Sequence, residues 1–250
     1  MKVGRIFLTS IIAFALIGIV FPDAQAGPEG IPEDAAQTIR DSMDIVKDFA
    51  KDAGQKIPPG ILESSAGIAI IPDVKQFAFF EGGRHGTGVL LTHDQNQWSL
   101  PVFAYISGRS LDAQIGVSSV DLLLIFCNSK AISKLQGTGN LDFGLDLTIT
   151  AGPMGGTADW STIDADVLAY KLTEGLFAGF YLSGGSLTPD PDMTFAYYVE
   201  SVHPTARGYY EEGREEMLVN DLLGLDDVLI LPNVPGGAMR LKRTMDRLSR

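Results

Sequence analysis

The segment from residue 67 to residue 184 constrains the fold most, because it is a series of short apolar or alternating runs. Gly, Pro, Asn and Asp separate these runs, and short runs with a period of two are typical of β-strands. Strands are expected at residues 67–71, 77–80, 87–92, 98–106, 111–117, 120–127, 141–149, 166–172 and 176–184. So many short strands with few helices between them favour an antiparallel, strongly curved sheet or partial barrel over a doubly wound parallel sheet.

Residues 141–149 carry the clearest strand pattern. Apolar and polar residues alternate strictly there, with Leu141, Phe143, Leu145, Leu147 and Ile149 on one side and Asp142, Gly144, Asp146 and Thr148 on the other. Because side chains of a strand point alternately to its two faces, one face is expected on the core and the other in a polar setting.

Helices are expected on both sides of the strands. Apolar residues recur at spacings of three and four over residues 33–53, which is typical of an amphipathic helix, and the prolines at 58 and 59 prevent its continuation. Residues 129–136 form a short expected helix, and residues 237–249 a final one. The expected fold class is therefore α+β, a curved antiparallel sheet or partial barrel with flanking N- and C-terminal helices.

The first 26 residues resemble a leader. Lys2 and Arg5 precede an apolar run at 6–20, and Ala24-Gln25-Ala26 is a small-x-small cleavage site. We therefore expect residues 1–26 to be a signal peptide and the protein to be exported by a bacterium, to the periplasm or as a secreted protein. Residues 27–203 are expected to form one domain with its core at about 35–200, and residues 204–250 to add an acidic segment and a basic C-terminal helix packed on that domain.

Composition limits the classes of function. The chain has 19 Lys and Arg against 31 Asp and Glu, a net charge of −12, and loss of the first 26 residues makes it −13. This acidity argues against nucleic acid as a partner, because such binders need a basic face for phosphates. A single cysteine cannot form a cysteine-built zinc site, and three histidines are few for a histidine metal cluster. Neither a metal nor a cofactor is therefore expected.

The sequence contains few residues or motifs that are typical of enzymes. It contains no P-loop, nucleophile elbow or zinc-protease motif, and its histidines, His85, His93 and His203, are expected in turns or loops. The glycine-rich residues 82–88 are expected to form a loop before a strand, whereas phosphate cradles precede a helix. We expect a protein that is not an enzyme, and a hydrolase using Asp142 and Asp146 on one strand face is the weakest alternative.

Charge is distributed unevenly. Residues 33–56 carry a net charge of −2, so an anionic membrane should repel the N-terminal helix, and its apolar residues are expected to pack on the sheet. The C-terminal helix has the opposite sign and is the better electrostatic candidate for a membrane surface. Its cations are Arg240, Lys242, Arg243, Arg247 and Arg250.

Seven short strings occur in an order and spacing that resemble the SYLF-domain family, over roughly residues 35–200. They are Ile-Pro-Pro-Gly-Ile-Leu at 57–62, Gly-Ile-Ala-Ile-Ile-Pro at 67–72, Gly-Gly-Arg-His-Gly-Thr-Gly-Val at 82–89, Trp-Ser-Leu-Pro-Val-Phe at 98–103, Gln-Ile-Gly at 114–116, Ala-Gly-Pro-Met-Gly at 151–155 and Gly-Leu-Phe-Ala-Gly at 175–179. Each string alone is weak, but seven in order are specific.

The resemblance implies binding of phospholipid, including phosphatidylinositol lipids in eukaryotic members, binding of actin in fungal members, and no catalytic activity. It also implies that membrane contact involves an N-terminal amphipathic helix, whose face here would be Ile39, Met43 and Val46. An exported bacterial protein is not expected to meet actin or phosphoinositides. A lipid or membrane surface is therefore the expected partner, and the oligomeric state stays open.

Candidate lipid contacts follow from charge and apolar character. The candidate cations for head groups are Lys75, Arg84, Arg240, Lys242, Arg243 and Arg247. Trp98 and Phe103 are candidate apolar contacts, with ordinary core packing as the alternative for both. The alternative function is an envelope structural or protein-interaction module that has no lipid ligand.

Overall fold

The computed structural model describes residues 33–52, 60–78, 82–94, 97–110, 116–144, 146–154, 163–173, 176–179, 184–200, 213–224 and 234–249. The expected signal peptide, residues 1–26, lies outside the described residues, as do residues 204–212 and 225–227 of the acidic segment. The expected strand at 111–117 is described only from residue 116 onward.

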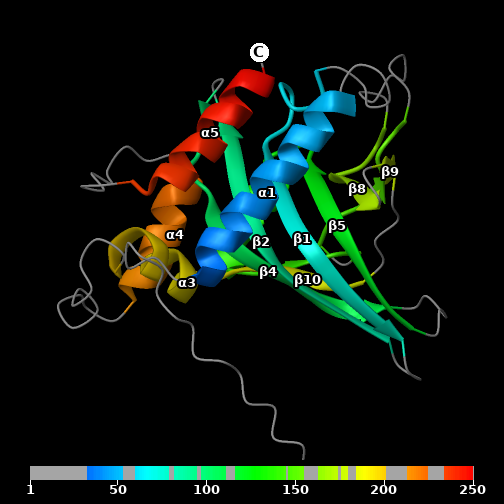
Figure 1. Cartoon of the computed structure of the whole chain (residues 1–250), viewed down its shortest axis with the longest axis horizontal. Helices are drawn as coiled ribbons and strands as arrows, with labels where there is room; N and C mark the ends of the chain where they lie inside the picture. The colour runs from blue at the N-terminus through cyan, green and yellow to red at the C-terminus, as the bar shows by residue number, and fades with distance from the viewer. Residues whose placement is uncertain are drawn as a thin grey trace, which may run out of the picture.

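A ten-stranded sheet forms the centre of the molecule (Figure 1). Its strands are β1 (Gly67–Ala78), β2 (Gly82–Asp94), β3 (Gln97–Trp98), β4 (Val102–Ser110), β5 (Gly116–Phe126), β6 (Leu141–Asp142), β7 (Ile149–Ala151), β8 (Val167–Thr173), β9 (Leu176–Gly179) and β10 (Ser186–Pro189). The strand order is β6-β10-β4-β2-β1-β5-β8-β7, with β3 on β2 and β9 on β8. All pairs are antiparallel except β7 with β8, so the expected curved antiparallel sheet is confirmed with one parallel pair added.

The expected single strand at 141–149 is wrong. β6 ends at Asp142, the chain turns at Gly144 with a φ of 87°, and β7 begins at Ile149 on the opposite edge of the sheet. Phe143 and Leu147 are both buried in this turn, and their burial explains why apolar residues alternate with polar ones here. The alternating pattern therefore reports burial correctly but not backbone conformation.

This short link also explains the curl of the sheet. Seven residue steps from Asp142 to Ile149 can span at most about 25 Å, and the turn shortens that reach. The two edge strands, β6 and β7, must therefore approach each other, and the sheet curls into an open half-barrel.

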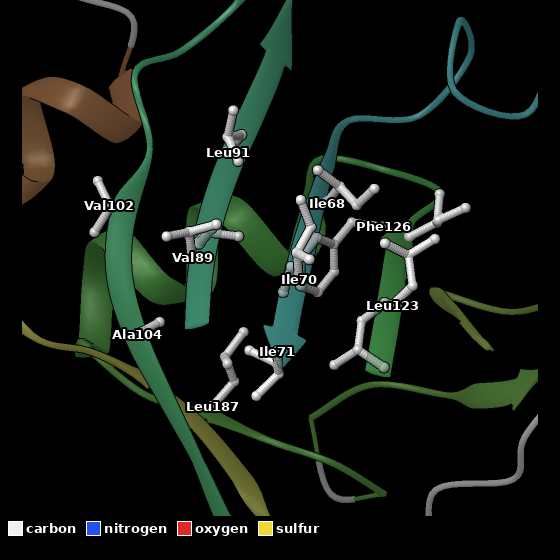
Figure 2. Packing of buried hydrophobic residues seen from close by; sticks show 14 of the residues in the cluster. Ile68, Ile70, Ile71, Val89, Leu91, Val102, Ala104, Leu123, Phe126 and Leu187 are labelled. Carbon is white, nitrogen blue, oxygen red and sulfur yellow. The ribbon is translucent and has the colours of Figure 1, made fainter. Parts of the chain in front are cut away.

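Both faces of the sheet are buried in its central part. Because directly paired residues of adjacent antiparallel strands point to the same face, one apolar row can be followed across five strands. This row, which defines the outer face, consists of Phe103, Val89, Ile70, Leu123 and Tyr170. The neighbouring row on the inner face consists of Val102, Leu90, Ala69, Leu124 and Ala169. Figure 2 shows side chains from β4, β2, β1 and β5 meeting in this core.

The glycine-rich residues 82–88 lie inside β2 rather than in a loop, which corrects the sequence-based expectation. A Cβ atom on Gly88 would lie 2.1 Å from the carbonyl oxygen of Ile70, and one on Gly86 would lie 3.0 Å from side-chain atoms of Ile71 and Val74. These glycines therefore allow the backbone of β1 to lie very close to β2, at the place where the pairing of the two strands is irregular between Ile70 and Lys75.

Helices cover the outer face and the ends of the sheet. They are α1 (Glu33–Asp52), α2 (Lys130–Thr138), α3 (Pro191–Phe195), the π-helical turn η2 (Ala196–Glu200), α4 (Arg214–Gly224) and α5 (Gly236–Leu248). α1 and α5 lie side by side over the sheet in Figure 1, and they contact each other. The expected helices at 33–53, 129–136 and 237–249 are confirmed to within two residues at each end.

Candidate functional site

α5 separates its apolar and cationic residues onto opposite sides. Ala238, Leu241 and Met245 are fully buried against the rest of the fold. Arg240, Arg243 and Arg247 are exposed, and their spacings of three and four residues place them along one side of the helix. We call these three residues the arginine ridge.

The ridge keeps its charge unneutralised. Within the described residues, none of its three guanidinium groups takes part in an ion pair. The fourth cation of α5 differs, because Lys242 Nζ lies 3.1 Å from a carboxylate oxygen of Asp246. Asp246 also accepts a hydrogen bond from the backbone N–H of Trp98 at 3.0 Å. Lys242 therefore belongs to the contact between α5 and β3, and the ridge is the part of α5 that can attract anions.

α1 carries charges of both signs on different flanks. Ile39 touches the start of α5, since a Cβ on Gly237 would lie 3.0 Å from its Cγ2 atom. Met43 and Lys47 follow Ile39 at intervals of four residues, so they continue along the side of α1 nearest α5. Asp41 and Asp48 project on another flank, where their charges act on Asp121 of β5. The charges of Asp41 and Asp48 thus lie on a flank of α1 other than the one nearest α5.

The apolar face of α1 packs on the sheet. Ile39 and Val46 are 3% and 2% exposed, and Met43 is partly buried at the edge of the same face. The ring of Phe49 lies 6.1 Å from that of Tyr170 in an edge-to-face arrangement. In this structure the amphipathic face is therefore part of the core.

Two candidate cations lie on neighbouring strands but on opposite faces. Lys75 is exposed on β1 and pairs with Asp73 at 2.6 Å. Its partner in the ladder is His85, so Arg84, the residue before His85, points to the other face, where it is 5% exposed. The structure therefore does not gather Lys75 and Arg84 into one surface.

The candidate aromatic residues are buried. Trp98 stacks on His93 with ring centroids 4.5 Å apart and donates from Nε1 to the hydroxyl of Ser249 at 2.9 Å. Phe103 packs edge-to-face on Tyr197 at 5.1 Å. Both side chains are 0% exposed, which is the core packing that the sequence left as their alternative. His93 is partly buried in β2, which corrects its expected place in an exposed turn, and His85 is exposed but also in β2.

The two carboxylates of the hydrolase alternative have structural partners. That of Asp142 accepts a hydrogen bond from the side-chain amide of Asn140 at 3.1 Å. Asp146 accepts the backbone N–H of Asp142 at 3.1 Å and pairs with Lys134 at 3.2 Å. That hydrogen bond and the lysine lower the pKa of Asp146, which suits a structural acceptor and not a general acid. Among the described residues there is no group of three or more potential metal ligands. Of the helices in the described ranges, none combines the length and hydropathy needed to cross a bilayer.

One polar cluster has no local signal in the sequence. Asp166, just before β8, accepts hydrogen bonds from the backbone N–H and hydroxyl of Thr148, from Asn128 and from Lys130, all at 2.9–3.1 Å. Burial alone would raise the pKa of Asp166, but these donors outweigh burial and lower it to about 2. Only the folded chain brings these residues together, from positions up to 38 residues apart.

Comparison with known proteins identifies similar chains. Residues 107–206 match the family described as Ysc84, Las17-binding protein actin regulator. An SH3 domain-containing protein of Schizosaccharomyces pombe is 31% identical over 152 residues, which cover 58% of this chain and 35% of that protein. Protein YSC84 of Saccharomyces cerevisiae is 26% identical over 179 residues, 67% of this chain and 38% of that protein. The human SH3 domain-containing YSC84-like protein 1 is 25% identical over 181 residues, 69% of this chain and 53% of that protein. The chain thus spans about a third to a half of the length of these relatives.

Proposed function

Because this chain carries a domain of the Ysc84/SYLF family, we propose that it is an exported, non-enzymatic protein that binds the surface of anionic phospholipid membranes. The family domain itself rests on the sequence similarity described above. Lipid as the ligand, the absence of an enzymatic activity and export from the cell are the parts that we propose.

The arginine ridge of α5 is the observation that carries the proposal. It presents three exposed cations that have no ion pair within the described residues, on a chain whose net charge is −12, so this positive surface is not explained by overall composition. Each Lys or Arg near an anionic lipid surface contributes about 1 kcal/mol of attraction. α5 is anchored through its opposite side, so the ridge can meet head groups while the helix stays folded on the sheet.

The neighbouring side of α1 supports the same surface. Lys47 lies on the side of α1 nearest α5, and its pairing with Asp44 is an exposed contact that neutralises it only weakly. Asp41 and Asp48 project on a different flank of α1, so their negative charges lie away from the ridge. We therefore expect the membrane to approach over the seam between α1 and α5.

Export is proposed from residues 1–26 alone, through their cationic start, apolar run and small-x-small site. Determination of the N-terminal residue of the protein recovered from the extracytoplasmic fraction would test it. A mature chain that begins at Gly27 supports export, and a chain that retains residues 1–26 in the cytoplasm contradicts it.

Vesicle co-sedimentation tests the lipid proposal. We expect binding to vesicles of phosphatidylglycerol and phosphatidylcholine at low salt, loss of binding at high salt, and weak binding to pure phosphatidylcholine. The double substitution Arg243→Gln with Arg247→Gln should weaken partitioning by about 30-fold, from about 1 kcal/mol per lost charge. The double substitution Lys75→Gln with Lys134→Gln removes the same charge outside α1 and α5 and should change partitioning little. No binding to either vesicle, with no lipid found in the purified protein by mass spectrometry, would contradict the proposal.

A protein-interaction module is the second candidate function. The observation that favours it is the description of the matched family as Las17-binding and actin-regulating, which concerns protein partners. Co-sedimentation with actin filaments separates the two candidates. Binding to filaments without binding to vesicles would favour the interaction module, whereas binding to vesicles alone would favour the membrane function.

A further inference from the structure

α1 is attached to the sheet differently from the other helices. Each of the other described helices has a polar bond to the sheet or to residues next to it: Lys130 with Asp166 for α2, Thr194 with Phe103 for α3, Tyr198 with Pro101 for η2, Leu223 with Thr92 for α4, and Asp246 with Trp98 for α5. Among the described residues, the hydrogen bonds and ion pairs of the polar side chains of α1 all lie within α1. Apolar packing therefore holds this helix in place.

That packing contains an unsatisfied polar group. Ser42 is 0% exposed in the middle of the packed face, and its hydroxyl has no hydrogen-bond partner in the part of the chain that the structure describes. A buried hydroxyl without a partner loses its hydration and gains nothing in return. Release of α1 would return this hydroxyl to water, so Ser42 lowers the free energy needed for release.

Like charges face each other along one flank of the same interface. Asp121 of β5 is partly buried, and the negative charges of Asp73, Asp41 and Asp48 act on it. Asp73 has Lys75 and Ser119 as partners, whereas Asp121 accepts a backbone hydrogen bond from Asp73 at 2.8 Å. Asp41 and Asp48 belong to α1, so their repulsion by Asp121 also falls when the helix leaves.

From these three observations we propose that α1 is a releasable element, which undocks from the outer face as a unit while the sheet remains folded. Release uncovers two apolar surfaces together, the stripe of Ile39, Val46 and Phe49 on α1 and the part of the sheet around Tyr170 beneath it. It also frees the side of α5 that Ile39 touches. The proposal concerns the protein alone and does not depend on the identity of any ligand.

Hydrogen–deuterium exchange of the full chain without vesicles tests the proposal. The amides of α1 should exchange at least about tenfold faster than those of α5, a second helix packed on the same side of the sheet, and faster than those of β1 and β5. Ser42→Ala should slow exchange in α1 by about fivefold or more, because it removes the unpartnered hydroxyl. Asp121→Asn should also slow it, since Asn keeps the acceptor oxygen but not the charge.

Ser133→Ala, at an exposed position of α2, is the matched control and should leave α1 unchanged. Exchange of α1 at the same rate as β1, through global unfolding only, would overturn the proposal. Faster exchange of α1 in Ser42→Ala would overturn it too, because it would mean that the hydroxyl stabilises the docked helix. No vesicle is present, so failure of the lipid proposal would leave these outcomes unaffected.

Discussion

The indole N–H of Trp98 donates a hydrogen bond of 2.9 Å to the hydroxyl of Ser249, a residue 151 positions further along the chain. Ser249 in turn donates to the carbonyl oxygen of Met245, and the backbone N–H of Trp98 reaches Asp246. The short strand β3 therefore fixes the C-terminal end of α5. This contact also fixes the direction of the arginine ridge, which lies on the opposite side of α5.

Ser249→Ala should destabilise the protein by about 1–3 kcal/mol, because it leaves the buried indole N–H of Trp98 without an acceptor. Urea unfolding followed by circular dichroism measures the change. Trp98→Phe combined with Ser249→Ala should cost less than the sum of the two single substitutions, since both remove the same bond. Additive effects would mean that the hydrogen bond contributes nothing to stability.

Gly88→Ala should be among the most destabilising single changes in the chain. Its Cβ would lie 2.1 Å from the backbone oxygen of Ile70, so β1 and β2 would have to separate, at a cost of about 3 kcal/mol or more. Gly137→Ala in α2 is the control, because a Cβ there has no neighbour within 4 Å. It should stabilise the protein by up to about 1 kcal/mol through helix propensity. Thermal unfolding of both variants tests the contrast.

The sequence predicts those parts of the fold that local patterns determine. α1 and α5 follow from apolar spacings of three and four, and most strands follow from short runs between turn residues. The turn at 143–148 could not be predicted, because burial of Phe143 and Leu147 imitates strand alternation while Gly144 turns the chain. β10 and α3 show no strong period, and their places depend on pairing with β4, which is distant in sequence.

Some features of the candidate site could likewise be predicted from the sequence, and others could not. The arginine ridge could be predicted, because charge and helical spacing are local properties of α5. The burial of Arg84 could not, because it depends on strand register set by glycines such as Gly88, whereas core packing of Trp98 was already the alternative that the sequence offered. The cluster around Asp166 could not be predicted either, because its hydrogen-bond donors come from separate segments of the chain.

Asp166→Asn should remove stability at neutral pH, together with the part of the pH dependence between about pH 4 and pH 2 that this carboxylate supplies. The pKa of Asp166 in the folded protein is about 2, below its ordinary value of 3.8, so its ionised form stabilises the fold above that ordinary value. The contribution is about 2 kcal/mol and is lost as the pH falls through the folded pKa. Unfolding free energies from pH 2 to 7 measure it, with Asp164→Asn as the exposed control. Parallel pH profiles for Asp166→Asn and the unmodified chain would contradict this role.

Asp121→Asn should act in the opposite direction. Burial first, and then the charges of Asp73, Asp41 and Asp48, raise the pKa of Asp121 above its ordinary value. The folded state therefore binds this proton more tightly than the unfolded chain does, and ionised Asp121 lowers stability as the pH rises through that interval. Asn at this position cannot ionise, so the variant should be more stable than the unmodified chain at pH 7, by roughly 0.5–1 kcal/mol for a partly solvated cluster. Below the ordinary pKa of aspartate the two proteins should be equally stable, because Asp121 is then protonated in both states. Urea unfolding at pH 7 and pH 3 measures both differences, and a less stable Asp121→Asn at pH 7 would mean that the carboxylate stabilises the contact between α1 and β5.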